Sequence, residues 1–200
     1  MSSLILEDLF QRNDGQLHMA QAIAAGVSRS QFYAWRDHGL IEAISRGIYR
    51  LTSLPVLSQP DLVIASLRFP RSVVCLLSAL SYHGLTTHIP HALDLAVTKQ
   101  SRLPQLDFPP IQAHRFSDVS FLAGIETHQI DNVPVRIYDP EKTLVDCFKF
   151  RHKIGLDLIL EALNIYKKQF TIKTNQVMAY AKICRVDKII TPYMESLLCL

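Results

Sequence analysis

The chain has 200 residues, of which 48% are hydrophobic and 20% are charged, a globular composition with room for one large or two small domains. Its net charge of +3 is too small to indicate nucleic-acid binding from composition, so such a function would need local groups of cations. The sequence has neither a signal-peptide pattern nor an apolar run of about 18 residues, so we expect a cytoplasmic protein without a membrane segment.

Two short helices are predicted at the start of the chain. Residues 3–12 carry apolar side chains at helical spacing, with Ser2 or Ser3 as the cap. A second helix is predicted over residues 17–25, closed by Gly26, with four side chains facing inward: Leu17, Ala20, Ile23 and Ala24.

A third helix has clear signals at both ends. Ser28 and Gln31 have the spacing of a capping box, and Val27 and Phe32 have that of a hydrophobic staple. Gly39 predicts the end of the helix. Its period of 3.6 places Phe32 and Trp35 on one face, together with the flanking Val27 and Leu40, and leaves a polar face of Arg29, Ser30, Tyr33 and Arg36.

A hairpin is predicted directly after this helix. Residues 41–44 and 48–51 are rich in β-branched and aromatic side chains, and Ser45-Arg46-Gly47 forms the turn with Arg46 at its tip. Residues 27–51 contain four arginines and only two acidic residues, Asp37 and Glu42.

This order of elements predicts a winged helix-turn-helix domain over residues 1–53. The third helix would enter the major groove of DNA, and the hairpin would contact the adjacent backbone or minor groove. The alternative is a surface helix and hairpin whose arginines are merely solvated. The candidate DNA-binding residues are Arg29, Ser30, Gln31, Tyr33, Arg36, Arg46 and Arg50.

The rest of the chain is predicted to be a second, α+β domain. Prolines and serines place a linker at residues 54–60, and the domain spans 61–200, with a mainly antiparallel sheet and C-terminal helices. We expect helices over residues 61–69 and 78–85, the latter capped by Ser78. Strands are expected over 93–98, 111–116, 124–130 and 133–138, the last two joined by a turn at Asp131-Asn132.

The C-terminal helices have separate start signals. Asp139-Pro140 combines an N-cap aspartate with a proline at the first helical position. Gly155 precedes a strongly apolar helix, Thr174 is expected to cap another, and Thr191-Pro192 should open or kink the last.

No group of residues predicts an enzyme, a metal site or a cofactor. Cys75, His83, His88 and His91 lack the spacing of a zinc site. Asp139, Glu141 and Asp146 could be paired acids, but Asp139 is explained by capping and Asp146 by an ion pair with Lys142. The phosphate-binding, dinucleotide-binding and hydrolase glycine motifs are absent from the sequence.

The remaining polar features have ordinary explanations. The four cysteines, Cys75, Cys147, Cys184 and Cys199, are widely spaced and are predicted to be reduced and mostly buried. The basic runs 149–153 and 167–173 are typical of solvated helix faces, and the alternatives are an acidic partner or additional DNA phosphates.

Three segments together resemble one family. These are G-V-S-R-S-x-F-Y-x-W at 26–35, S-A-L-S-Y-H-G-L at 78–85 and Y-D-P-E-K-T-L-V-D-C-F at 138–148. In this order they resemble the AbiEi-type antitoxins of bacterial abortive-infection (type IV) toxin-antitoxin systems.

The resemblance implies a winged helix that binds double-stranded DNA at inverted repeats of its own promoter and represses the operon. Inverted repeats would allow a dimer on DNA, and the sequence leaves the oligomeric state open. It also implies a C-terminal domain that counteracts a nucleotidyltransferase-like toxin. The chain lacks the G-S-x-x-D-x-D motif of such toxins. The alternatives are a winged-helix protein-interaction module and a general transcriptional regulator without a toxin partner.

Overall fold

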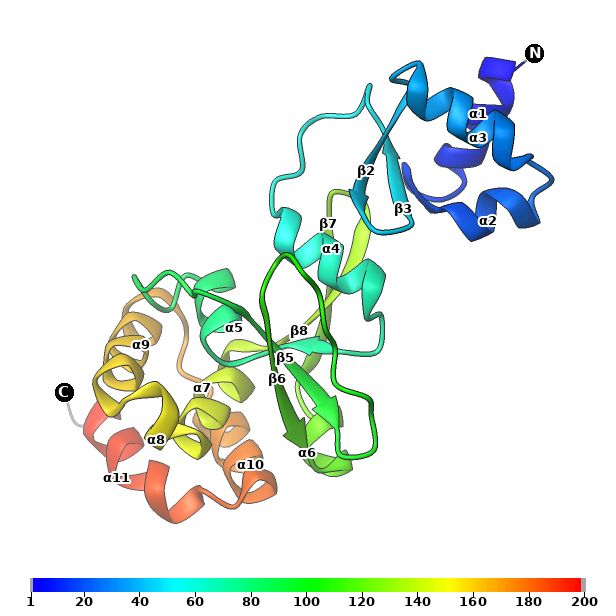
Figure 1. Ribbon diagram of the computed structural model, residues 1–200. Coiled ribbons are helices and arrows are strands. Elements are labelled where there is room, and N and C mark those ends of the chain that lie inside the picture. The colour runs from blue at the N-terminus through cyan, green and yellow to red at the C-terminus, as the bar shows by residue number, and fades with distance from the viewer. Residues whose placement is uncertain (1, 199–200) are drawn as a thin grey trace. The chain divides into compact units, whose positions relative to one another are not determined.

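The computed structural model describes residues 2–198, and the side chains of residues 5–197 (Figure 1). The predicted cap at Ser2 or Ser3 and the thiol of Cys199 lie outside the described side chains. The chain divides into two compact units: residues up to Arg68 together with Gln129–Pro134, and Phe69–His128 together with the residues from Val135 onward. The domain limits drawn from composition stay a prediction.

The first unit has the predicted winged-helix order of elements. In chain order these are α1 (Ser2–Gln11), β1 (Gln16–His18), α2 (Met19–Ala24), α3 (Arg29–Asp37), β2 (Ile41–Ser45), β3 (Ile48–Leu51) and α4 (Pro60–Arg68). The three strands form an antiparallel sheet in the order β1-β3-β2.

The second helix starts two residues later than predicted. Leu17 belongs to β1, because Gln16–His18 pairs with β3, the second strand of the hairpin β2–β3, which is here called the wing. The backbone amide of His18 then donates to Gln21 Oε1 at 2.8 Å, which fixes the start of α2 at Met19.

The inward face predicted for α2 was also wrong in part. Ala22 is the buried alanine, Ala20 and Ala24 are exposed, and Ile23 is half-buried. Consecutive small residues carry no strong hydrophobic period, so the sequence could not fix the rotation of this helix.

The core of the first unit is formed by side chains from α1, α2, α3 and the three strands. Its buried members are Leu6, Phe10, Leu17, Ala22, Val27, Phe32, Trp35, Ile41, Tyr49 and Leu51. Leu40 was predicted to join them but is 44% exposed, because the backbone turns at Gly39, whose φ is +69°.

The second unit contains a mixed five-stranded sheet. Its strands are β4 (Val73–Val74), β5 (Leu93–Thr98), β6 (Ile111–Phe116), β7 (Ile125–Ile130) and β8 (Val133–Tyr138), in the order β6-β5-β4-β8-β7. The turn Asp131-Asn132 joins β7 and β8 into the predicted hairpin, whose tip belongs to the first unit, and β4 and β5 are antiparallel. The pairs β5–β6 and β4–β8 are parallel, a feature that the prediction of a mainly antiparallel sheet did not include.

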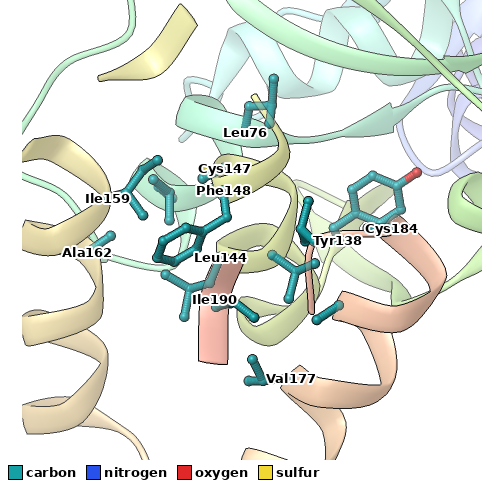
Figure 2. Packing of buried hydrophobic residues seen from close by; sticks show 14 of the residues in the cluster. Leu76, Tyr138, Leu144, Cys147, Phe148, Ile159, Ala162, Val177, Cys184 and Ile190 are labelled. Atoms are coloured by element: carbon teal, nitrogen blue, oxygen red, sulfur yellow. The ribbon is translucent and has the colours of Figure 1, made fainter. Parts of the chain in front are cut away.

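The helices of the second unit are α5 (Leu76–Tyr82), α6 (Asp118–Leu122), α7 (Pro140–Lys149), α8 (Arg151–Ile154), α9 (Leu156–Gln169), α10 (Thr174–Cys184) and α11 (Asp187–Leu198). Helix α7 is central and packs against α5, α9 and α10. Leu144, Cys147 and Phe148 of α7 lie in the apolar core that these helices share (Figure 2).

Two helix starts differ from the predictions, and for the last helix one of the two predicted alternatives, a start at Thr191-Pro192, is wrong. Helix α5 begins at Leu76, and Ser78 lies inside it, where its hydroxyl accepts a hydrogen bond from the amide of Asp94 at 2.8 Å. Lys173 occupies the N-cap of α10, so Thr174 is its first helical residue. Helix α11 starts before Thr191 and runs through Pro192.

Cys75, Cys147 and Cys184 are buried free thiols, as predicted. Within residues 2–198, no helix has the length and apolar character needed to cross a bilayer.

Candidate nucleic-acid interface

Both ends of α3 are fixed by local hydrogen bonds. At the N-terminus, Ser28 Oγ accepts from the amide of Gln31 at 3.2 Å. At the C-terminus, the amide of Gly39 donates to the carbonyl of Arg36 and the amide of Leu40 to that of Trp35, each at 2.9 Å. This is the Schellman arrangement, so α3 is a short helix of defined length.

Aromatic packing sets the rotation of α3. Phe32 is fully buried and meets the ring of Tyr49 edge-on, with 4.8 Å between ring centroids, and Trp35 is 3% exposed. The opposite face is therefore turned to solvent. Arg29, Ser30, Tyr33 and Arg36 are all exposed, which is the orientation expected from the helical period.

The two arginines of α3 differ in their surroundings. Arg36 forms an ion pair with Asp37, with 2.8 Å between Nη2 and Oδ1, and its guanidinium lies 4.8 Å from the centroid of the Tyr33 ring. The hydrogen bond to Asp37 also raises the pKa of Arg36. In the part of the chain that the structure describes, the side chain of Arg29 has neither an ion pair nor a hydrogen bond, so Arg29 is the more available cation.

Arg29 also borders a hollow between α2 and α3. The hollow has a volume of about 540 Å³ and is lined by Met19, Ala20 and Ile23 from α2 and by Arg29 and Tyr33 from α3. Ala20 and Ile23 were predicted to lie on the inward face of α2, because the rotation of the alanine-rich helix was misjudged. The hollow combines a cation, a phenol group and an apolar wall on the exposed side of the helix pair.

The wing presents a further cation. Arg46 is exposed at the turn between β2 and β3, where Gly47 adopts a φ of +78°. The carbonyl of Arg46 accepts a hydrogen bond from Arg68 Nη1 at 3.0 Å, so the backbone of the tip is held in place.

Two candidate residues are placed differently. Gln31 is half-buried. Arg50 is only 4% exposed, and its guanidinium donates to the carbonyl of Pro55 and lies 3.6 Å from Glu42 Oε1. The structure therefore groups Arg29, Ser30, Tyr33 and Arg36 on one surface, adds Arg46 on the wing, and leaves Arg50 inside the fold.

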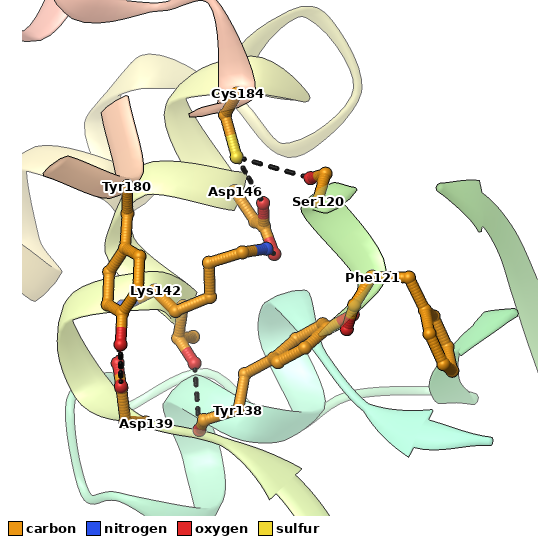
Figure 3. A network of polar contacts seen from close by, with 9 residues as sticks. Ser120, Phe121, Tyr138, Asp139, Lys142, Asp146, Tyr180 and Cys184 are labelled. Atoms are coloured by element: carbon orange, nitrogen blue, oxygen red, sulfur yellow. Dashed lines mark hydrogen bonds and ion pairs between the residues drawn. The ribbon is translucent and has the colours of Figure 1, made fainter. Parts of the chain in front are cut away.

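The second unit contains a buried polar network around α7 (Figure 3). Asp139 Oδ1 accepts from the amide of Lys142 at 2.6 Å, which confirms the predicted N-cap. Its Oδ2 accepts from the hydroxyl of Tyr180 at 2.7 Å and from Gln176 Nε2 at 3.1 Å. Every hydrogen-bonding atom of this carboxylate is thus used within the fold.

The ammonium group of Lys142 forms the predicted ion pair with Asp146, and both side chains are fully buried. Asp146 Oδ1 also accepts from the thiol of Cys184 at 3.4 Å. Burial raises the pKa of Asp146 and that of Cys184. A buried thiol with a raised pKa is a poor nucleophile, so these contacts are those of a structural network.

The histidines that were considered as metal ligands do not form a site. His88 and His91 lie near each other, with 5.9 Å between ring centroids. His83 Nε2 instead forms a hydrogen bond with the carbonyl of Tyr138 at 2.7 Å. In the described part of the chain, no three His, Cys, Asp or Glu side chains are arranged to hold a metal ion.

The basic runs are partly engaged in local contacts. Lys149 and Lys153 each lie 6.0 Å from the centroid of the Phe150 ring, and Lys173 pairs with the buried Glu141 at 3.3 Å. Both runs belong to the second unit, and neither shares a residue with α3 or the hairpin β2–β3.

The geometry of the first unit defines a winged helix-turn-helix: a capped third helix with a polar outer face is followed by the hairpin β2–β3, and β1 completes a three-stranded sheet. Residues 5–52 match the family model described as "Transcriptional regulator, AbiEi antitoxin". The match confirms the predicted resemblance over this segment and supports a DNA-binding regulator of an abortive-infection system.

A solved structure shares the fold over most of the chain. The RV2827C protein from Mycobacterium tuberculosis aligns with a TM-score of 0.60 at 14% sequence identity, covering 90% of this chain and 71% of that one. This likeness concerns the fold alone. No curated protein matches the sequence.

Proposed function

We propose that the chain is a DNA-binding antitoxin that represses its own operon and counteracts a nucleotidyltransferase-like toxin of a type IV abortive-infection system. The observation that carries the DNA-binding part is the outer face of α3. Arg29, Ser30 and Tyr33 are exposed together near the start of a helix whose other face is locked in the core. The N-terminal residues of recognition helices reach the base edges, and a wing beside them contacts the backbone.

The hollow beside Arg29 supports base recognition. An arginine binds the O6 and N7 atoms of guanine with two hydrogen bonds, and apolar side chains contact the methyl group of thymine. Arg29 beside Ala20 and Ile23 offers both kinds of contact within one hollow. Arg46, on the wing, is assigned to phosphate contacts, as its flexible exposed side chain is suited to backbone charge.

The test is a salt titration of binding to the DNA upstream of this reading frame. Each phosphate that a cation contacts lowers the slope of log affinity against log salt by about 0.9. We expect a linear fall with a slope of several units for the full chain. A complete lack of binding to this DNA would instead favour a winged helix that docks a protein.

The antitoxin role needs a separate measurement. We expect the full chain to restore growth of cells in which the neighbouring toxin-like reading frame is expressed from an unrelated promoter. DNA binding without growth rescue would favour the alternative function, a general transcriptional regulator that has no toxin partner.

A further inference from the structure

The second unit contains a hollow of about 390 Å³ that plays no part in the proposed DNA interface. It lies between the segment Phe69–Ser72, directly before β4, and the loop Ser101–Pro104 that follows β5. These segments are neighbours because β4 and β5 are antiparallel, with Val73 opposite Ala96. The pairing of β4 with β5 therefore brings together the two segments that form this hollow, here called the Arg71–Arg102 hollow.

Two arginines and two serines supply its polar groups. Arg71 and Arg102 are exposed, and neither side chain has an ion pair or a hydrogen bond within the described part of the chain. No carboxylate is among the lining residues. Two guanidinium groups that border one hollow repel each other, and a shared anion relieves that repulsion. Arginine binds phosphate oxygens with paired, charge-assisted hydrogen bonds.

The walls are held in place by local hydrogen bonds. Ser72 Oγ donates to the carbonyl of Phe69 at 2.8 Å, and the hydroxyls of Ser101 and Thr98 are 2.7 Å apart. Arg136 Nη1 donates to the carbonyl of Arg71 at 3.0 Å. A ligand would meet a preformed backbone, so the cost of ordering on binding falls on the two arginine side chains.

The remaining lining residues are Phe69, Pro70, Val97 and Pro104, which form an apolar wall. The volume falls within the range of about 300–1,000 Å³ that is usual for small-molecule sites. An aromatic ring provides a stacking surface for a nucleobase, because every base has a flat π-face. The hollow therefore joins a site for an anion to a site for a flat ring.

We propose that the Arg71–Arg102 hollow binds a nucleoside phosphate, with the phosphate between the two guanidinium groups and the base against Phe69. The hollow and the α3 surface share no residue, so a lack of nucleotide binding would not bear on the proposed role of α3.

The experiment is isothermal titration calorimetry of the full chain with three probes: a nucleoside monophosphate, tested for each of the four bases, inorganic phosphate, and the unphosphorylated nucleoside. We expect at least one monophosphate to bind more tightly than phosphate or nucleoside alone. Arg71→Ala and Arg102→Ala should each weaken this binding about tenfold or more, as expected for a charge-assisted contact. Both side chains are exposed, so neither variant should affect folding.

Two further variants sharpen the test. Arg71→Lys keeps the charge but loses the paired geometry, so it should retain more affinity than Arg71→Ala. Lys182→Ala removes one exposed cation from α10 and should bind like the parent.

Three results would overturn the proposal. The first is that no monophosphate binds at millimolar concentration. The second is equal affinity of the parent and both alanine variants. The third is that phosphate binds as tightly as the nucleotide, which would remove the base from the assignment. If the first result holds and the arginine variants also weaken duplex DNA binding, the hollow would be a DNA-backbone contact.

Discussion

Lys142 and Asp146 form an ion pair one turn apart on α7, and neither side chain has any exposed surface. The Lys142 ammonium also lies 4.2 Å from the centroid of the Tyr138 ring, and the Asp146 carboxylate accepts a hydrogen bond from the thiol of Cys184. Removing two charges from water is costly, and only good geometry with additional partners offsets that cost. The second unit is therefore organised around a buried charge pair as well as an apolar core.

Breaking this pair should be strongly destabilising. We expect Asp146→Asn to lower the free energy of unfolding by about 3–5 kcal/mol, because the charge of Lys142 is left buried and unpaired. The double variant Lys142→Met with Asp146→Asn should regain much of this loss. Urea unfolding measures both. The control is Asp8→Asn in the exposed pair with Arg12, expected to cost less than about 1 kcal/mol. Equal losses at the two sites would contradict the importance of burial.

The burial of Asp139 predicts a pH dependence. Desolvation raises the pKa of its carboxyl above the ordinary value of 3.8. The folded protein then binds this proton more tightly than the unfolded chain does, so the contribution of Asp139 to stability falls as the pH rises.

We therefore expect the free energy of unfolding of the parent, relative to Asp139→Asn, to decrease from about pH 3.8 upward through the raised pKa. Chemical unfolding at a series of pH values gives this difference. A parent that gains on the asparagine variant with rising pH would show that the carboxylate is stabilised by its hydrogen bonds more than burial penalises it.

Arg50 should act on stability and not on base recognition. Its buried guanidinium donates to the carbonyl of Pro55 and lies near Glu42. We expect Arg50→Ala to lower the free energy of unfolding by about 1–3 kcal/mol, since the charged hydrogen bond to Pro55 and the packing of a buried side chain are both lost. Thermal unfolding measures this loss. Below the melting temperature, DNA affinity should stay near that of the parent, and a selective loss of promoter affinity in a fully folded variant would return Arg50 to the interface.

The winged helix should fold without the rest of the first unit. The buried members of its core cluster all lie between Leu6 and Leu51, and Leu54 packs against that cluster. A fragment of residues 1–56 keeps these side chains and also Pro55, the partner of Arg50. We expect it to unfold cooperatively and to bind DNA more weakly than the full chain, because the fragment lacks the second unit, which would pair two winged helices on an inverted repeat and so multiply the phosphate contacts. A fragment without a cooperative transition would show that the rest of the first unit is needed for folding.

Several elements were predictable because short-range signals specify them. Ser28, Gly39 and Asp139 mark helix ends through local backbone hydrogen bonds, and the sequence shows their spacing directly. The buried face of α3 followed from its aromatic residues, which have a clear helical period.

Other features depended on partners distant in sequence. Gln16–His18 became a strand only because β3 lies beside it, and β5 and β6 are parallel through a long connection that composition does not reveal. Arg50 resembles an exposed cation in the sequence, and its burial depends on a carbonyl in the following loop. The hollow beside Arg29 was missed because an alanine-rich helix does not fix its own rotation.

The central claim is that Arg29 reads bases at the start of α3. Fluorescence anisotropy would compare the parent, Arg29→Ala and the control Arg12→Ala, an exposed arginine in the turn directly after α1. Each is titrated with the DNA upstream of this reading frame and with a scrambled duplex of equal length. We expect Arg29→Ala to lose about 1–3 kcal/mol of binding on the upstream DNA and much less on the scrambled duplex. Arg12→Ala should match the parent on both, and an Arg29→Ala variant that binds the upstream DNA as tightly as the parent would contradict the account.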